Sequence, residues 1–311
     1  MSTDVSVVVC AYTEQRWDPL VAGIEALFAQ TLPPAQVVLS VDHNDELQRR
    51  ARDAFPGVDV VANEQEPGLS GARNTGIRHA KGEIVAFLDD DARPEVTWLE
   101  ALAAAFDDPE VVGAGGVALP EWVDGGRPAW LPAEMYWVVG CSYVGLPTDV
   151  AEIRNPIGAN MAFRREALRA AGGFVEGIGR VGTVPLGCEE TELAIRIRRL
   201  TGHVILHLPD ARVSHRVTGS RVTWRYFVSR CWSEGLSKAL VARHAGAEAA
   251  LASERAYAAR TLPAGVARGI RDAVRGDAAG LARAAAITVG LAITATGYIR
   301  GQLAKKPHLS R

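Results

Sequence analysis

The sequence predicts an α/β fold, in which helices flank a doubly wound, mostly parallel sheet and a helical extension follows toward the C-terminus. Short valine-rich runs alternate with amphipathic helical segments over about the first 120 residues. One apolar run, at residues 84–88, ends in three consecutive carboxylates, Asp89, Asp90 and Asp91. From residue 223 onward, the predicted segments are helical.

The first half of the chain carries most of the predicted sheet. Residues 5–12 read as a buried strand, and Asp18 followed by Pro19 predicts a helix that starts with an N-cap. The apolar face of that helix carries Leu20, Ile24, Leu27 and Phe28. Further elements are predicted as strands at residues 36–42, 58–62 and 84–88, a helix at 46–55, and a helix within GLSGARNTGIRHAKGE.

The second half of the chain interrupts this pattern. A helix at residues 95–106 and a strand at 111–119 precede an irregular segment, 120–156, which we expect to face the substrate. The alternative is a lid over the core without substrate contacts. Later elements are a strand ending at Phe163 with a helix after it, and a helix opening at Gly187 with Leu193, Ile197 and Leu200 on one side. A strand at 203–208, the segment 211–217 and a helix at 224–244 follow.

The composition is that of a globular enzyme. Of the 311 residues, 48% are hydrophobic and 23% are charged, and the formal net charge is −2, so no nucleic-acid partner is expected. The four cysteines have neither metal-site spacing nor a disulfide framework. The N-terminus lacks the basic region and cleavage site of a signal peptide, and we therefore expect a cytoplasmic protein.

The C-terminal part contains an uncharged segment at residues 284–299, bounded by Arg283 and Arg300. It is shorter than the roughly 20 residues that a membrane span needs. One interpretation is a packing or oligomerisation helix, which leaves a homo-oligomer open. The other is peripheral contact with the cytoplasmic face of the membrane, favoured by nearby arginines. We divide the chain into residues 1–222, the catalytic domain, and residues 223–311, the helical extension.

The three adjacent carboxylates at residues 89–91 repel one another, so a counter-charge is expected beside them. Open α/β sheets bind ligands at the carboxyl ends of their strands, and carboxylate oxygens suit Mg²⁺ or Mn²⁺. The alternative is a solvated acidic turn, since aspartate is favourable near a helix N-terminus.

Several motifs occur at predicted strand ends in a fixed order: VVVCAYTE, GARNTGI, FLDDDARP and GCEETELAIR. Together they resemble the family 2 glycosyltransferases, which have the GT-A (nucleotide-diphospho-sugar transferase) fold with a Rossmann-like sheet. The resemblance covers roughly residues 5–240. Within the family, the most similar group is the glucosyl-dolichyl-phosphate glucuronosyltransferase-like proteins, through SVDHN, GLSGARNTG, WVVGCSY, RNPIGANMAFRR, GCEETEL and RCWSEGLSKA.

The resemblance implies a nucleotide-sugar donor, UDP- or another NDP-sugar. Asp42 would face the pyrimidine, and Arg73 would lie near the base and ribose. The alternatives are a helix N-cap for Asp42 and a locally paired surface charge for Arg73. The donor-binding residues implied are Ala11, Tyr12, Thr13, Glu14, Asp42, Arg73, Asp89 and Asp90.

The resemblance also implies a metal ion, Mg²⁺ or Mn²⁺. Asp89 and Asp91 match the D-x-D pattern, in which the last acid binds the metal that neutralises the leaving diphosphate. Asp90 lies between them and can point elsewhere, because alternate strand residues face opposite ways. His215, in ARVSHRV, is a further candidate ligand, with a structural histidine as the alternative.

A carboxylate is also needed to take the proton of the acceptor hydroxyl in an inverting transfer. In GCEETEL, Glu189 and Glu190 lie in the first turn of a predicted helix. The family motif usually reads Glu-Asp with the second acid as the base, so we expect Glu190 to be the base, with Glu189 and then Glu192 as alternatives. The acids could instead only complement the helix dipole.

The expected function is therefore an inverting glycosyltransferase that moves a hexose or hexuronic acid to a hydroxyl acceptor. The acceptor would be a polyprenyl-phosphate-linked sugar or a cell-envelope glycan, with a soluble acceptor as the alternative. A second alternative is a nucleotide-sugar-binding subunit without turnover. A nucleotidyltransferase would need a glycine-rich loop, which AYTEQRWD lacks, and a glycosidase would need no nucleotide site.

Overall fold

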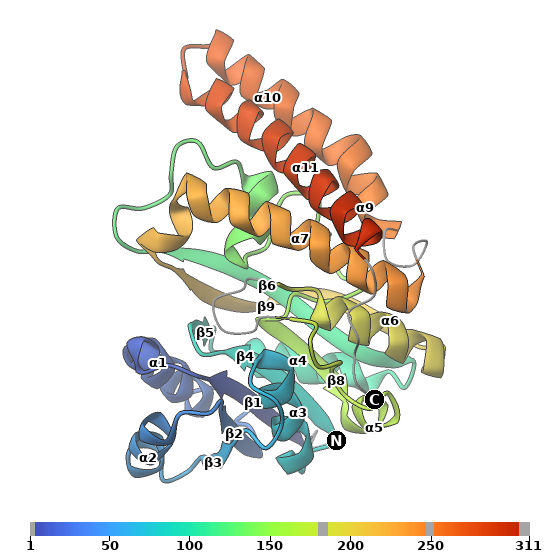
Figure 1. Ribbon diagram of the computed structural model, residues 1–311. Coiled ribbons are helices and arrows are strands. Elements are labelled where there is room, and N and C mark those ends of the chain that lie inside the picture. Colours follow the sequence, from blue (N-terminus) through green and yellow to red (C-terminus); the bar gives the residue numbers. More distant parts are fainter. Residues whose placement is uncertain (1–3, 180–185, 247–251, 305–311) are drawn as a thin grey trace.

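The computed structural model describes residues 4–179, 186–246 and 252–304 (Figure 1). The strands of the sheet in these residues are β1 (Val5–Ala11), β2 (Gln36–Val41), β3 (Asp59–Ala62), β4 (Ile84–Asp89), β5 (Ala92–Pro94), β6 (Val111–Trp122), β7 (Ala151–Glu152), β8 (Asn160–Arg164) and β9 (Val204–Val217). They form one mixed sheet in the order β3-β2-β1-β4-β8-β6-β9-β5, and β7 pairs with β9.

The helices of the described residues are α1 (Trp17–Phe28), α2 (Asp45–Ala54), α3 (Leu69–His79), α4 (Trp98–Ala104), α5 (Arg165–Ala170), α6 (Glu189–Thr201), α7 (Trp224–Ala245), α9 (Ala252–Ala256), α10 (Leu262–Val274) and α11 (Ala279–Leu303). Short turns of other helix types are η1 (Glu14–Arg16), η2 (Ala105–Asp107), η3 (Ala133–Val139), η4 (Gly219–Val222) and η5 (Tyr257–Thr261).

The sheet confirms the predicted α/β class. Strands β3, β2, β1 and β4 are parallel to one another, as the alternation of strands and helices predicted. Strand β8 then pairs antiparallel with both β4 and β6, while β6 and β9 are again parallel. The strand predicted at residues 203–208 and the segment 211–217 form one long strand, β9, whose pairing with β6 shifts register at Gly116. Strands β5 and β7 were not predicted.

Both faces of the sheet are covered, which explains why its strands read as continuous apolar runs. In β1, Val7 and Val9 pack into the cluster under α1, α2 and α4, while Val8 packs into the cluster with α3, α5 and α6. Successive residues of a strand point to opposite faces, so one valine-rich strand serves both clusters. Its carboxyl end is consequently fixed between the two layers.

A third apolar cluster joins the irregular segment to the C-terminal helices. It contains Met135 of η3, Phe227 of α7 and Ile287 of α11. Figure 1 shows α7 beside the β6–β9 part of the sheet, with α10 and α11 as a pair on its far side. The predicted division between residues 222 and 223 lies just before α7 and stays a prediction.

Helices α7 and α11 approach each other at glycines. A Cβ atom at Gly235 would lie 2.2 Å from the carbonyl oxygen of Thr294, and one at Gly297 would lie 2.5 Å from that of Trp232. Such distances are far below van der Waals contact. Only glycine therefore allows the two helix backbones to lie this close.

The apolar segment predicted at residues 284–299 lies within the longer helix α11. Among the described residues, this helix alone has the length and composition of a membrane span, with a mean hydropathy of 1.4 over its best window, of which 28% is buried. One face packs on α7 and α10, as the packing interpretation predicted. Large apolar side chains also remain exposed on this pair, including Ile270, Val274, Leu281, Ile299 and Leu303.

Three local predictions were wrong. Helix α1 begins at Trp17 after the short turn η1, so Asp18 lies in its first turn and is not the N-cap. Phe28 and Leu200 are 53% and 59% exposed. Both lie in the last turn of their helices, beyond the apolar clusters of the described residues.

Candidate active site

The polar residues at the strand ends line one cavity of about 1040 Å³. It opens where the carboxyl ends of β1, β2 and β4 meet, which is the expected ligand position in an open α/β sheet. Of the predicted site residues, the cavity is lined by Ala11, Tyr12, Asp42, Arg73, Asp89, Asp90, Asp91, Glu189, Glu190 and His215. Thr13 and Glu14 are not among the lining residues.

Of the residues at and after the end of β1, some line the cavity and others shape the loop behind it. Ala11 is buried and Tyr12 is 44% exposed at the cavity. Thr13 caps η1 by accepting a hydrogen bond from the Gln15 N–H, at 3.3 Å. Glu14 lies 3.6 Å from Arg50. Thr13 and Glu14 thus shape the loop that carries Tyr12.

Asp42 organises the loop that precedes α3. Its Oδ2 accepts a hydrogen bond from the Gly68 N–H at 2.9 Å, and its Oδ1 accepts one from Asn63 Nδ2 at 2.7 Å. The N-cap of α2 is instead Asn44, which accepts from the Leu47 N–H. Asp42 is therefore not a helix cap in this structure, and it lies at the cavity wall.

Arg73 is not a surface charge. Its side chain is 2% exposed, and its guanidinium donates to Glu189 Oε1 at 2.9 Å, to Asp89 Oδ1 at 3.3 Å and to the Gly158 carbonyl at 3.0 Å. The residue therefore joins the end of β4 to the start of α6. This position links the acids of the predicted donor side to those of the predicted base.

Asp90 follows the end of β4 and lines the cavity together with Asp89 and Asp91, and its predicted orientation away from them stays a prediction. Its Oδ1 pairs with Arg16 at 2.5 Å, and its Oδ2 has no hydrogen-bond partner among the described residues. Burial raises the pKa of Asp90 to about 7, against the opposing charge of Arg16. Arg16, from η1, was not singled out by the sequence, because only the fold brings it to the acids.

Asp91 lies at the centre of a charged group. Its carboxylate is 3.0 Å from Arg221, 3.2 Å from His215 Nε2 and 3.3 Å from Arg16. Burial alone would raise the pKa of Asp91, but these charges hold it well below its ordinary value. Burial would likewise lower the pKa of His215, but the carboxylate of Asp91 raises it to about 10.

Three of the predicted ligands come together. Asp89, Asp91 and His215 each offer one ligand atom, and these atoms lie within 4.8 Å of one another. Two carboxylates suit Mg²⁺ or Mn²⁺, and the imidazole nitrogen is more typical of a transition metal. The donor set therefore fits a divalent cation.

The two acids at the start of α6 have different environments. Glu189 is buried against Arg73, whereas Glu190 makes no ion pair among the described residues. Burial and the neighbouring Glu189 carboxylate raise the pKa of Glu190 to about 7. The preceding Cys188 has a φ of 69°. This left-handed conformation is uncommon for a residue other than glycine and turns the chain sharply into the helix.

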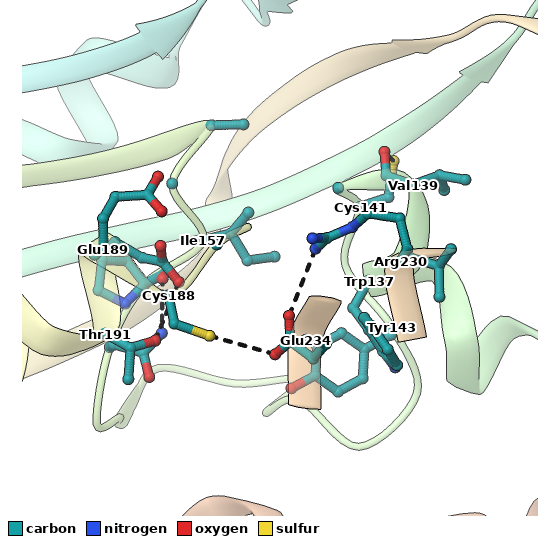
Figure 2. Close-up of a pocket in the computed structure, with 18 of the residues that line it drawn as sticks. Trp137, Val139, Cys141, Tyr143, Ile157, Cys188, Glu189, Thr191, Arg230 and Glu234 are labelled. Atoms are coloured by element: carbon teal, nitrogen blue, oxygen red, sulfur yellow. Dashed lines mark hydrogen bonds and ion pairs between the residues drawn. The ribbon is translucent and has the colours of Figure 1, made fainter. Parts of the chain in front are cut away.

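Figure 2 shows Cys188, Glu189 and Thr191 on one side of the cavity and residues of α7 on the other. Thr191 Oγ1 donates to Glu190 Oε1 at 3.1 Å. Glu192, the third candidate base, is buried and paired with Arg196. That pairing favours a structural role for Glu192.

The arrangement can bind a nucleotide diphosphate and take up a proton. Carboxylates and a histidine that fit a cation lie at the ends of β4 and β9, and a carboxyl group with a raised pKa lies at α6. A carboxylate with a pKa near the working pH is suited to act as a general base.

Comparison with known proteins identifies the relatives of this chain. The family model described as "Glycosyl transferase family 2" matches residues 6–172. The glucosyl-dolichyl phosphate glucuronosyltransferase of Haloferax volcanii is 35% identical over 238 residues, which cover 75% of this chain and 76% of that protein.

Two solved structures share the fold. The mannosyltransferase PcManGT of Pyrobaculum calidifontis, in complex with GDP-Man and Mn²⁺, has a TM-score of 0.55 at 20% identity, over 94% of this chain and 86% of its own. GalNAc-T7 with UDP, GalNAc and Mn²⁺ has a TM-score of 0.51 at 22% identity, over 68% and 43%. These likenesses confirm the predicted GT-A fold.

Proposed function

This chain belongs to the family 2 glycosyltransferases, and from that premise we propose that it is an inverting enzyme. It transfers a hexose or hexuronic acid from a UDP- or other NDP-sugar to a hydroxyl group of a polyprenyl-phosphate-linked sugar. The observation that carries the proposal is a single cavity that holds both the cation-compatible acids and the carboxyl group of Glu190.

The donor lies over the carboxyl ends of β1, β2 and β4 in this proposal. Ala11, Tyr12 and Asp42 contact the nucleoside, and Asp89 lies beside the ribose and diphosphate. Arg73 holds Asp89 and Glu189 in place through one hydrogen bond to each, and thereby fixes the distance between the donor side and α6.

Mg²⁺ or Mn²⁺ would be held by Asp91, Asp89 and His215. When bound, such an ion stabilises the negative charge that develops on the leaving diphosphate. Both structural relatives contain Mn²⁺, which supports this choice. Arg16 and Arg221, which contact Asp91, would supply further positive charge beside the diphosphate.

Glu190 is the general base. Its carboxylate takes the proton of the acceptor hydroxyl while the hydroxyl oxygen attacks the anomeric carbon and the bond to the diphosphate breaks. Glu189 is committed to the buried pair with Arg73. The raised pKa of Glu190 favours proton uptake near neutral pH.

The name of the Haloferax volcanii relative supports a lipid-linked acceptor. The exposed apolar side chains of α10 and α11, together with the exposed Arg271 and Arg275, would then hold the enzyme at the cytoplasmic membrane face. A soluble acceptor is the alternative, and it would need no such surface.

Calorimetric titration with UDP and GDP, with and without Mn²⁺, tests the donor site. We expect one nucleotide to bind, and to bind more tightly with Mn²⁺. A subsequent screen of donors against polyprenyl-phosphate-linked and soluble sugars identifies the acceptor. If neither nucleotide binds under any condition, the proposed donor site is wrong.

A further inference from the structure

The two ring nitrogens of His215 face different parts of the fold. Strand β9 holds its backbone between β6 and β5, opposite Pro120 on one side and Ala92 on the other. The side chain is buried, and its Nε2 lies 3.2 Å from Asp91 Oδ1. Nε2 is therefore on the side of the proposed cation site, and whatever contacts Nδ1 can orient the ring from behind.

The end of η3 supplies that contact. Cys141 Sγ lies 3.7 Å from His215 Nδ1. The preceding residue, Gly140, has a φ of 82°, and a Cβ atom there would lie only 3.1 Å from His215 Cε1. Glycine adopts this left-handed conformation without strain and lets the backbone lie against the edge of the ring. The motif WVVGCSY in the irregular segment thus packs directly on the imidazole.

The position of Cys141 is itself fixed by the backbone. Its N–H donates to the Tyr136 carbonyl at 3.1 Å, which closes the end of η3. The next residue, Ser142, donates its N–H to the Ala118 carbonyl at 2.8 Å and accepts from the Ala118 N–H through Oγ at 2.9 Å. Ala118 belongs to β6, the neighbour of β9. The thiol and the imidazole are therefore attached to adjacent strands of one sheet.

The contacts of the thiol indicate which ring nitrogen carries the proton. Cys141 Sγ lies 3.9 Å from the carbonyl oxygen of Val139, to which the thiol hydrogen donates (Figure 2). The sulfur then accepts the Nδ1–H of His215. A metal-ligating histidine commonly donates its second ring N–H to a fixed acceptor, which leaves the lone pair of the other nitrogen for the ion. Here that lone pair is on Nε2, beside Asp91.

We propose that Cys141 is a positioning residue for the metal site, whose sulfur accepts the Nδ1–H of His215 and thereby directs the Nε2 lone pair at a cation held with Asp89 and Asp91. The inference rests on the proposed function, since it needs a divalent cation at these acids. The thiol acts through His215 and is not a ligand. A sulfur ligand would favour Zn²⁺, whereas carboxylates suit Mg²⁺ and Mn²⁺.

Cys141→Ala removes the acceptor and should weaken Mn²⁺ binding by roughly 10- to 100-fold, the usual cost of removing the partner of a metal-ligating histidine. Titration of the full chain with Mn²⁺, with and without UDP, measures this without turnover through the electron paramagnetic resonance signal of the unbound ion. Cys141→Val fills the space of the thiol but accepts no hydrogen bond, so it should show the same loss. Cys141→Ser keeps an acceptor and should bind Mn²⁺ more tightly than either.

Two controls separate positioning from packing. Cys231→Ala removes a buried thiol of α7 that does not line the cavity, so it should leave the Mn²⁺ affinity unchanged. In a His215→Ala background, Cys141→Ala should cause no further loss, because the residue through which the thiol acts is gone. A loss of the same size with and without His215 would overturn the proposal, and so would an effect of Cys231→Ala equal to that of Cys141→Ala.

The remaining outcomes distinguish this inference from the proposed function. If the wild type binds Mn²⁺ and Cys141→Ala binds it equally well, the inference alone is wrong. If the wild type binds no Mn²⁺, with or without UDP, the proposed metal site is wrong and the inference fails with it. If Cys141→Ser weakens Zn²⁺ binding much more than Mn²⁺ binding, the sulfur is itself a ligand and the positioning role is wrong.

Discussion

Glu190→Gln should strongly slow turnover and make the protein more stable at the same time. The amide keeps the shape of the side chain but cannot accept the acceptor's proton. We expect a loss of roughly 10²–10⁴-fold in kcat with nearly unchanged donor binding, which is the usual contribution of a general base.

The gain in stability follows from the pKa of Glu190. In the folded protein it is raised from an ordinary value of 4.5 to about 7, so the folded state holds the proton more tightly than the unfolded state. The favourable contribution is complete below pH 4.5 and is lost as the pH rises through 7. At 1.36 kcal/mol per pKa unit, the buried charge costs about 3 kcal/mol above pH 7.

A glutamine does not incur this cost. The variant should therefore exceed the wild type in Tm by roughly 6 °C at pH 8.5 and should match it near pH 4.5. Thermal unfolding at several pH values measures the difference, and kcat of the wild type should rise up to about pH 7 and then level off. A Tm difference that does not depend on pH would refute the reasoning about the pKa.

Glu189→Gln is the matched control. It leaves Arg73 buried without its main carboxylate partner, so it should destabilise the protein by roughly 3–5 kcal/mol. The two neighbouring substitutions are thus expected to change stability in opposite directions. If Glu190→Gln turns over normally and Glu189→Gln is inactive despite folding, the base is Glu189.

Asp91→Asn should lower kcat by roughly 10²–10³-fold and remove the Mn²⁺ dependence of UDP binding in calorimetry, since the ion loses its central ligand; full activity in excess chelator would contradict this. Val274→Glu, at an 84% exposed position on α10, should reduce sedimentation with anionic vesicles, whereas Val96→Glu, which is 56% exposed away from that pair, should not. Equal sedimentation of both variants would argue against the membrane surface. Gly235→Ala should destabilise the protein by roughly 1–3 kcal/mol in denaturant unfolding, because its Cβ meets the α11 backbone. Gly57→Ala, whose Cβ would lie 3.5 Å from Phe28, is the control, and an equal effect of both would refute the packing argument.

The sequence was most informative where one short stretch decides the structure. Valine-rich β1 and the apolar run before Asp89 predicted buried parallel strands, because both faces of such strands must be apolar. The acids that follow them were predicted to meet, since parallel strands end at one edge. Strand β5 was not predicted because it is three residues long, which is too short to give a periodic signal.

Contacts between segments far apart in the chain could not be predicted from a single sequence. Arg16 and Arg221 both contact Asp91, but 205 positions separate them along the chain, and nothing near either residue indicates the other. The spacing of Arg230, Glu234 and Lys238 places them on one face of α7, but the contact of Lys238 with Glu254, which also pairs with Arg154, depends on how α9 folds back.

The glycine contact between α7 and α11 has an evolutionary consequence. Gly235 and Gly297 face the partner helix's backbone at points only one turn apart, so a larger residue at either position separates the same two helices. In homologues that keep this helix pair, small residues should occur at both positions together. Lineages that lose one should lose the other as well. In those lineages the side chains of the third apolar cluster should be larger, because α7 and α11 lie further apart.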